Sequence, residues 1–93
     1  MYNVIREDVY FSNKMETITS VIVSNVSFLT ATQFLESEYQ EQIDIHENNF
    51  PYDEYDKKYI KCDKTYAKLS EYMPLKTEHI IILQVVEERN DIQ

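Results

Sequence analysis

Polar and apolar residues alternate along the first part of the chain. Over Tyr2–Phe11, tyrosine, valine, isoleucine and phenylalanine stand at roughly every second position, which is the period at which a strand presents side chains to one face of a sheet. Glu16–Val23 is dominated by β-branched residues, which lose side-chain freedom in a helix and fit a pleated surface. The pattern predicts two antiparallel strands joined by a turn at Ser12-Asn13-Lys14.

A helix is the alternative for the second of these segments, so that Glu16–Leu29 has two interpretations. Apolar residues in this part of the chain recur at spacings of three and four, the period of one helix face: they are Met15, Ile18, Ile22, Val26 and Leu29. We favour the strand because β-branched residues dominate the segment.

Capping signals predict that a helix begins at Ala31. Thr30 and Gln33 have the spacing of a capping box, in which the side chain of each residue binds the backbone N–H of the other. Leu29 and Phe34 are spaced for the hydrophobic staple that often accompanies such a box.

This predicted helix is amphipathic. With residues placed at about 100° intervals, the apolar ones fall in one arc: they are Ala31, Leu35, Tyr39 and Ile43, with Phe34 at the margin. The acidic ones occupy the rest of the surface: they are Glu36, Glu38, Glu41 and Asp44. We expect the apolar arc to face the core and the acidic side to face solvent.

A second helix is predicted over Tyr52–Met73. Asp44–Pro51 has the composition of a loop, in which we expect a positive φ at Asn48 or Asn49, and Pro74 would end the helix. Between them, residues advance by alternating steps of three and four, as on a seam of three heptads: Tyr52, Tyr55, Tyr59, Cys62, Tyr66, Leu69 and Met73. Because tyrosine hydroxyls need polar partners, this seam suits packing against the sheet or an interface with another chain.

The most strand-like run of the chain is Ile80–Val86, in which Gln84 is the one polar residue. Such an apolar run indicates a central strand covered on both faces. We therefore expect a small α+β protein in the order β-β-α-α-β, with an antiparallel sheet and two helices on one face. No repeat, low-complexity tract or linker divides the sequence, so residues 1–93 are expected to form a single globular domain.

The charge of the chain is concentrated in one stretch. The sequence has 17 Asp+Glu against 9 Lys+Arg, a formal net charge of -8. Residues 30–56 contain no lysine or arginine, whereas residues 57–79 are rich in lysine. A surface of one sign repels nucleic acid and anionic membranes and attracts basic proteins. Solubility is the simpler explanation for any one carboxylate, and the unbroken acidic run favours a surface that imitates nucleic-acid phosphates.

The chain contains no glycine, which excludes the motifs that bring backbone close to a phosphate or a nucleophile: the Walker loop, GxGxxG, the nucleophile elbow and the EF-hand. Cys62 is the only cysteine. We interpret it as a buried hydrophobe, because a nucleophile would need His46 or His79 as its base. The acidic residues near His46 lack the spacing of a calcium loop. We therefore expect no catalytic residue, no metal ion and no cofactor.

The sequence predicts a cytoplasmic protein. The N-terminus, MYNVIREDVYF, lacks the apolar core of a secretory signal, and a single cysteine can form no intrachain disulfide. The uncharged stretch Thr17–Leu35 contains too many polar residues to span a membrane.

In its small size, its acidity and its lack of a catalytic motif, the chain resembles the inhibitor proteins that phages and mobile elements direct at host nucleases, including anti-restriction and anti-CRISPR proteins. The resemblance is one of composition and includes no motif, so it assigns no role to any residue.

We expect a non-enzymatic inhibitor that occupies a basic, nucleic-acid-binding surface of a partner protein and binds neither nucleic acid nor membrane itself. The residues expected to bind the partner are the carboxylates of the acidic stretch and three tyrosines within or just after it: Glu36, Glu38, Glu41, Asp44, Glu47, Asp53, Glu54, Asp56, Tyr52, Tyr55 and Tyr59. The alternative is a structural or regulatory homodimer joined through the tyrosine-rich segment Tyr52–Met73.

Overall fold

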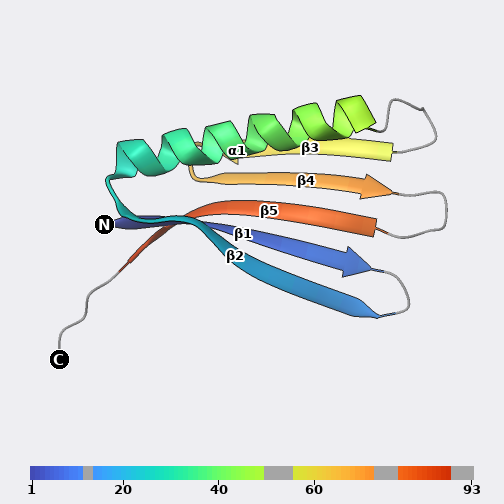
Figure 1. Ribbon diagram of the computed structural model, residues 1–93, viewed down its shortest axis with the longest axis horizontal. Coiled ribbons are helices and arrows are strands. Elements are labelled where there is room, and N and C mark those ends of the chain that lie inside the picture. Colours follow the sequence, from blue (N-terminus) through green and yellow to red (C-terminus); the bar gives the residue numbers. More distant parts are fainter. Residues whose placement is uncertain (12–13, 50–55, 73–77, 89–93) are drawn as a thin grey trace.

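The computed structural model describes residues 1–11, 14–49, 56–72 and 78–88. Within these residues five strands and one helix follow in the order β1 (Tyr2–Phe11), β2 (Met15–Val26), α1 (Phe28–Asn49), β3 (Asp56–Asp63), β4 (Tyr66–Tyr72) and β5 (Glu78–Glu87). The strands form one antiparallel sheet in the spatial order β2-β1-β5-β4-β3, and α1 packs on one face of it (Figure 1). The expected α+β class is confirmed, with one helix in place of two.

The β-branched and apolar runs at the two ends of the chain form strands, as predicted. β1 and β2 make an antiparallel hairpin from Phe11 opposite Met15 to Tyr2 opposite Val26, so the alternative helix in this segment is wrong. Residues 12 and 13 of the predicted turn lie outside the described residues. β5 contains the predicted Ile80–Val86 and lies in the centre of the sheet, between β1 and β4.

The helix starts at Phe28 and not at Ala31. Its N-cap is Ser27, whose Oγ accepts a hydrogen bond from the Thr30 backbone N–H at 3.2 Å and donates one to the Thr30 Oγ1 at 3.0 Å. Thr30, expected as the cap, is therefore a residue of the first turn. The Ser27 hydroxyl thus binds the backbone N–H three residues along the chain, the role that Thr30 was expected to play toward Gln33.

The helix also ends later than predicted, because it continues to Asn49 through most of the segment expected to be a loop. The positive φ expected at Asn48 or Asn49 is absent there. Among the described residues, the one positive φ is 58° at Asn25, just before the helix cap. Asparagine tolerates this left-handed conformation better than most residues with a Cβ atom. Asn25 lies within β2, where the pairing with β1 is irregular between Val23 and Val26, and its backbone N–H donates to Asn3 Oδ1 at 2.9 Å.

Residues 56–72 form a β-hairpin, so the predicted second helix is wrong. β3 and β4 pair in antiparallel fashion, with Tyr59 opposite Leu69. The turn between the strands is held by Asp63, whose Oδ1 accepts hydrogen bonds from the Thr65 N–H and hydroxyl at 2.6 Å each. Such an Asx turn supplies a tight reversal in a chain that has no glycine.

The tyrosine seam does not exist in this hairpin. Tyr59 and Leu69 pack toward α1, whereas Tyr66, next to the buried Ala67, points to the opposite face of the sheet. The helix on which the alternative homodimer was based is therefore wrong, because these residues form strands. Tyr52 and Tyr55 lie outside the described residues.

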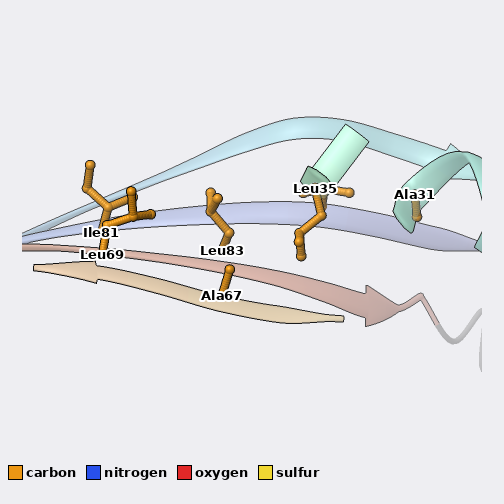
Figure 2. Close-up of a cluster of buried hydrophobic side chains, with 7 residues drawn as sticks. Ala31, Leu35, Ala67, Leu69, Ile81 and Leu83 are labelled. Carbon is orange, nitrogen blue, oxygen red and sulfur yellow. The ribbon is translucent and has the colours of Figure 1, made fainter. Parts of the chain in front are cut away.

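The apolar core lies between α1 and the middle of the sheet. Alternate residues of the inner strands point toward the helix, where Leu35 points back at them (Figure 2). The fully buried residues are Val4, Ala31, Leu35, Ala67, Leu69, Ile81 and Leu83. The predicted apolar arc of the helix is thus confirmed, with Tyr39 and Ile43 packed at the edge of the core.

The opposite face of the sheet carries no helix in the part of the chain that the structure describes. Ile80 and Ile82 point to this side, since they alternate with Ile81 and Leu83, and both are half-buried. We expected β5 to be covered on both faces, but in the described residues a helix covers only one of them.

Replacing Leu83 with alanine leaves a cavity between β5 and α1. We expect Leu83→Ala to lower the free energy of unfolding by about 2–5 kcal/mol. Leu29→Ala is the matched control, because Leu29 is 67% exposed on α1, and its effect should stay within about 0.5 kcal/mol. Urea unfolding followed by circular dichroism measures both values. Equal losses for the two variants would contradict this position of the core.

Candidate functional site

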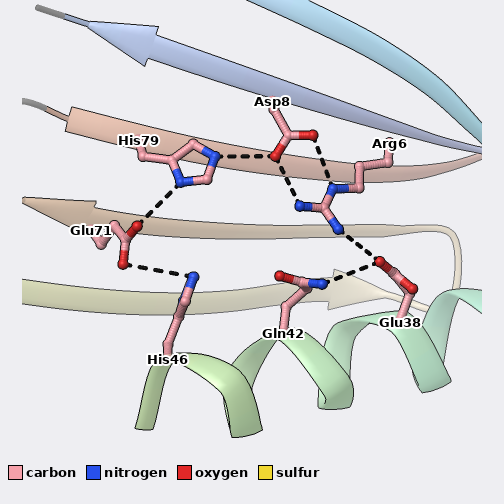
Figure 3. A network of polar contacts seen from close by, with 7 residues as sticks. All are labelled: Arg6, Asp8, Glu38, Gln42, His46, Glu71 and His79. Atoms are coloured by element: carbon pink, nitrogen blue, oxygen red, sulfur yellow. Dashed lines mark hydrogen bonds and ion pairs between the residues drawn. The ribbon is translucent and has the colours of Figure 1, made fainter. Parts of the chain in front are cut away.

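A chain of charged and polar side chains crosses the interface between α1 and the sheet (Figure 3). Those of its residues that lie on strands are two or four positions from the core residues Val4, Leu69 and Ile81, and therefore point to the same face of the sheet, toward the helix. We call this set the ionic chain: Arg6 and Asp8 on β1, Glu38, Gln42 and His46 on α1, Glu71 on β4 and His79 on β5.

Arg6 joins the sheet to the helix at one end of the ionic chain. Its Nε and Nη2 donate to the two carboxylate oxygens of Asp8 at 2.9 and 3.0 Å, and its Nη1 donates to Glu38 Oε1 at 2.8 Å. Gln42 Nε2 donates to the same Glu38 oxygen at 3.3 Å. Bidentate arginine–carboxylate contacts are among the strongest hydrogen bonds in proteins. The bond to Asp8, with a smaller effect of Glu38, raises the pKa of Arg6 against the opposing effect of burial.

His79 lies between two carboxylates. Its Nδ1 is 3.1 Å from Glu71 Oε1 and its Nε2 is 3.1 Å from Asp8 Oδ1. The Tyr10 ring stacks on the imidazole, with centroids 4.2 Å apart and an angle of 7° between the planes. Burial by itself lowers the pKa of His79, but the hydrogen bonds to Glu71 and Asp8 outweigh it and the pKa is raised. The site therefore favours the imidazolium, which donates from both ring nitrogens.

Asp8 is the central acceptor of the ionic chain, since it binds both Arg6 and His79. Burial raises the pKa of Asp8, but the hydrogen bonds from Arg6 and from His79 outweigh this effect, so the pKa is lowered. The hydrogen bonds from Arg6 and His79 thus favour the ionised carboxylate in an interface that leaves the Asp8 side chain 10% exposed.

Glu71 continues the ionic chain from the sheet to the last turns of α1. Its side chain is 4% exposed, and its Oε2 lies 3.6 Å from His46 Nε2. The His46 ring stacks near the Tyr59 ring, with centroids 6.4 Å apart, and the Tyr59 hydroxyl donates to Glu47 Oε1 at 2.9 Å. Burial, followed by this hydrogen bond, raises the pKa of Tyr59. Polar contacts thus attach the C-terminal half of α1 to β3 and β4.

The ionic chain is suited to fixing α1 on the sheet. An acid–base catalyst must present a proton-transferring atom to a substrate, whereas both ring nitrogens of His79 are engaged by carboxylates. No group of three or more His, Cys, Asp or Glu among the described residues is arranged to hold a metal ion. Because breaking a partly buried ion pair leaves a charge without its partner, we infer that these contacts help to specify how α1 lies on the sheet.

The structure divides the acidic residues expected to bind a partner into an inner and an outer set. Glu38 belongs to the inner set, because its side chain is 16% exposed and bound to Arg6, so its predicted position on the solvent side is wrong. The outer set is exposed on α1: Glu36, Glu41, Asp44 and Glu47.

Of the remaining predicted residues, Tyr59 and Asp56 belong to β3 and not to α1. Tyr59 lies in the sheet and packs at the edge of the core. Asp56 is the first residue of β3. The others lie outside the described residues: Tyr52, Asp53, Glu54 and Tyr55.

The exposed side of α1 combines carboxylates with apolar side chains. A shallow depression on it is lined by Ser37, Gln40, Glu41, Asp44, Ile45 and Asn48, and we call these residues, together with Phe34, the outer face. Phe34 is 43% exposed and Ile45 is 38% exposed. Asp44 Oδ1 accepts a hydrogen bond from Gln40 Nε2 at 3.0 Å. At the side of this face, Glu36 forms an ion pair with Lys61 of β3.

The sequence analysis missed the strand members of the ionic chain. The signal was available, because Arg6 and Asp8 continue the alternation that begins with Val4, and Glu71 and His79 stand two residues from Leu69 and Ile81. A charged residue in phase with core residues indicates a buried ion pair, since an unpaired charge there would be strongly unfavourable.

Comparisons with known proteins do not assign the site. No protein-family model matches the chain, and no curated protein matches it. In the described part of the chain, no helix is long and apolar enough to cross a membrane.

The raised pKa of His79 predicts how stability depends on pH. The folded protein holds this proton more tightly than the unfolded chain, whose histidines titrate at about 6.5. The contribution of His79 is therefore complete below about pH 6.5 and is lost as the pH rises through its folded pKa. We expect the free energy of unfolding to fall in that window, by at most about 1.4 kcal/mol per pH unit. Urea unfolding at a series of pH values measures the slope. His79→Gln should flatten it, and equal slopes in both proteins would exclude His79 as its source.

The division of the carboxylates is tested by a matched pair of substitutions on one helix. Glu38→Gln removes the charge that faces Arg6, and we expect it to lower the free energy of unfolding by about 1–3 kcal/mol. Glu41→Gln, one turn further along on the exposed side, should have no measurable effect. Thermal unfolding of the two variants decides the matter: if Glu41→Gln destabilised the protein as much as Glu38→Gln, the inner and outer sets would be wrongly assigned.

Proposed function

We propose that the protein is a non-enzymatic inhibitor that places the outer face of α1 on a basic, nucleic-acid-binding surface of a partner protein. The observation that carries the proposal is the separation of the carboxylates of α1. Glu38 is neutralised inside by Arg6, whereas Glu41, Asp44 and Glu47 are exposed on a helix that contains no lysine or arginine. The compositional resemblance to anti-restriction and anti-CRISPR inhibitors supports the same class of function.

The spacing of the exposed carboxylates supports mimicry of phosphates. Because an α-helix rises about 1.5 Å per residue, Glu41, Asp44 and Glu47 follow one another at about 4.5 Å along the helix axis. The phosphates of one DNA strand repeat at about 3.4 Å along the duplex axis. The two charge densities are comparable, so lysines and arginines that bind phosphates would also meet carboxylates on this helix.

The apolar part of the outer face supplies a second kind of contact. Phe34 and Ile45 are exposed beside the carboxylates. Charge pairs at an interface mainly raise the association rate and the specificity, whereas apolar side chains that become buried contribute much of the affinity. An outer face with both kinds of residue is thus suited to binding a protein rather than to keeping a helix soluble.

Charge reversal on the outer face tests the proposal. We expect immobilised protein to capture nucleic-acid-binding proteins from a bacterial lysate at low salt, and to release them when duplex DNA or moderate salt is added. The double variant Glu41→Lys/Asp44→Lys should lose the capture. Glu87→Lys/Glu88→Lys is the control, because it changes the net charge equally at exposed positions outside α1.

Two results would contradict the proposal. One is capture that ignores both salt and the Glu41→Lys/Asp44→Lys change. The other is equal loss of capture in the control variant, because net charge and not the outer face would then be responsible.

A further inference from the structure

The two edges of the sheet differ in how they are protected against pairing with another strand. β3 forms one edge and carries Lys57, Lys58 and Lys61 among its residues. Lysines on an edge strand are a common device against pairing with other chains. β2 forms the other edge and has no charged residue from Thr17 to Val26.

The side chains of β2 are also unusually exposed for apolar residues. Met15 is 64% exposed, Ile18 is 56% exposed and Val21 is 60% exposed. The pairing of β2 with β1 is regular from Met15 to Val21 and becomes irregular only beyond Val21. A regular stretch of this length spans about 24 Å at about 3.4 Å per residue, and its outer backbone groups lie at the edge of the described sheet.

We propose that β2 pairs with the β2 strand of a second copy of this chain, in antiparallel fashion and centred on Ile18. The two sheets then form one continuous sheet, with a two-fold axis through the middle of the regular stretch. The proposal concerns the edge of the sheet and does not depend on the function proposed for α1.

The sequence of β2 is complementary to itself about this centre. Residues directly opposite each other in an antiparallel pair lie on the same face of the sheet. A centre at Ile18 places Ile18 opposite itself, Thr17 opposite Thr19, and Met15 opposite Val21. Threonine pairs and pairs of apolar residues across strands both stabilise a sheet.

The charges of the chain also favour a second copy over a strongly charged partner. Glu16 is the one charged residue of the regular stretch, and pairing about Ile18 places it opposite Ser20 and not opposite the second Glu16. The C-terminal half of α1, with the exposed carboxylates, lies on the opposite side of the molecule from β2 in Figure 1. Two copies joined at β2 therefore keep their acidic helices apart, despite a net charge of -8 on each.

A disulfide across the two-fold axis tests the register. In a Cys62→Ser background, Ile18→Cys places two cysteines directly opposite each other, where Cα atoms are about 4.5–5.5 Å apart and within reach of a disulfide. We expect oxidised glutathione, reduced in the process, to convert this variant to a covalent dimer. The control is Val21→Cys in the same background. Its two cysteines would lie about 20 Å apart along the strands, and it should remain uncrosslinked.

A charge on the axis tests the interface without cysteine chemistry. Ile18→Lys places two lysines opposite each other, and we expect it to raise the dissociation constant of the dimer about tenfold or more in sedimentation equilibrium. Ile18 is 56% exposed, so the folded protomer can accommodate lysine at this position, and circular dichroism checks that the fold is kept. Ile60→Lys is the matched control, because Ile60 is 49% exposed on the other edge strand, and it should leave the dissociation constant unchanged.

The proposal is overturned if the unmodified protein remains monomeric at every concentration tested. In that case the β2 edge would be open to a strand of another protein. It is also overturned if a dimer forms but Ile60→Lys weakens it more than Ile18→Lys, or if Val21→Cys crosslinks more readily than Ile18→Cys.

Discussion

The ionic chain between α1 and the sheet is the contact on which the arrangement of the molecule depends. The apolar core holds the N-terminal half of the helix through the fully buried Ala31 and Leu35. Beyond Glu38, Tyr39 and Ile43 pack only at the edge of the core, and the buried contacts of Gln42 and His46 are polar. Ion pairs in such an interface add little net stability, because desolvation offsets their attraction. Breaking one leaves a charge without its partner, however, so the ionic chain specifies how the helix lies on the strands.

The ionic chain explains how a protein with a net charge of -8 can have several exposed carboxylates on one surface of α1. Arg6 and His79 pair with acidic groups from β1, β4 and α1 within the interface. The carboxylates left outside are fixed on a helix that is attached along its length. Charge on a rigid element binds a complementary surface with less loss of conformational entropy than charge on a flexible segment. The same helix covers one face of the sheet and leaves the edge at β2 open.

Much of the fold could be predicted from the sequence, because β-branched and alternating runs marked β1, β2 and β5. The error over residues 56–72 has a physical cause. Tyr59, Tyr66 and Leu69 fit a heptad, but Ala67, Leu69 and Glu71 also fit the two-residue period of a strand. The periodicity of one sequence does not distinguish the helix from the strand here, because the strand is stabilised by the pairing of β4 with β5, which is distant in sequence. The exposed carboxylates of α1 were predictable, whereas the inward position of Glu38 depends on Arg6, which is distant in sequence.

The central claim is that polar contacts fix the C-terminal half of α1 as firmly as apolar packing fixes the N-terminal half. Native-state hydrogen exchange of the backbone amides measures this most directly, since it reports the free energy of opening residue by residue. The account predicts that amides of residues 42–46 exchange only through the same large opening as those of residues 34–38. Exchange of residues 42–46 through local fraying, at a much lower opening free energy, would contradict it.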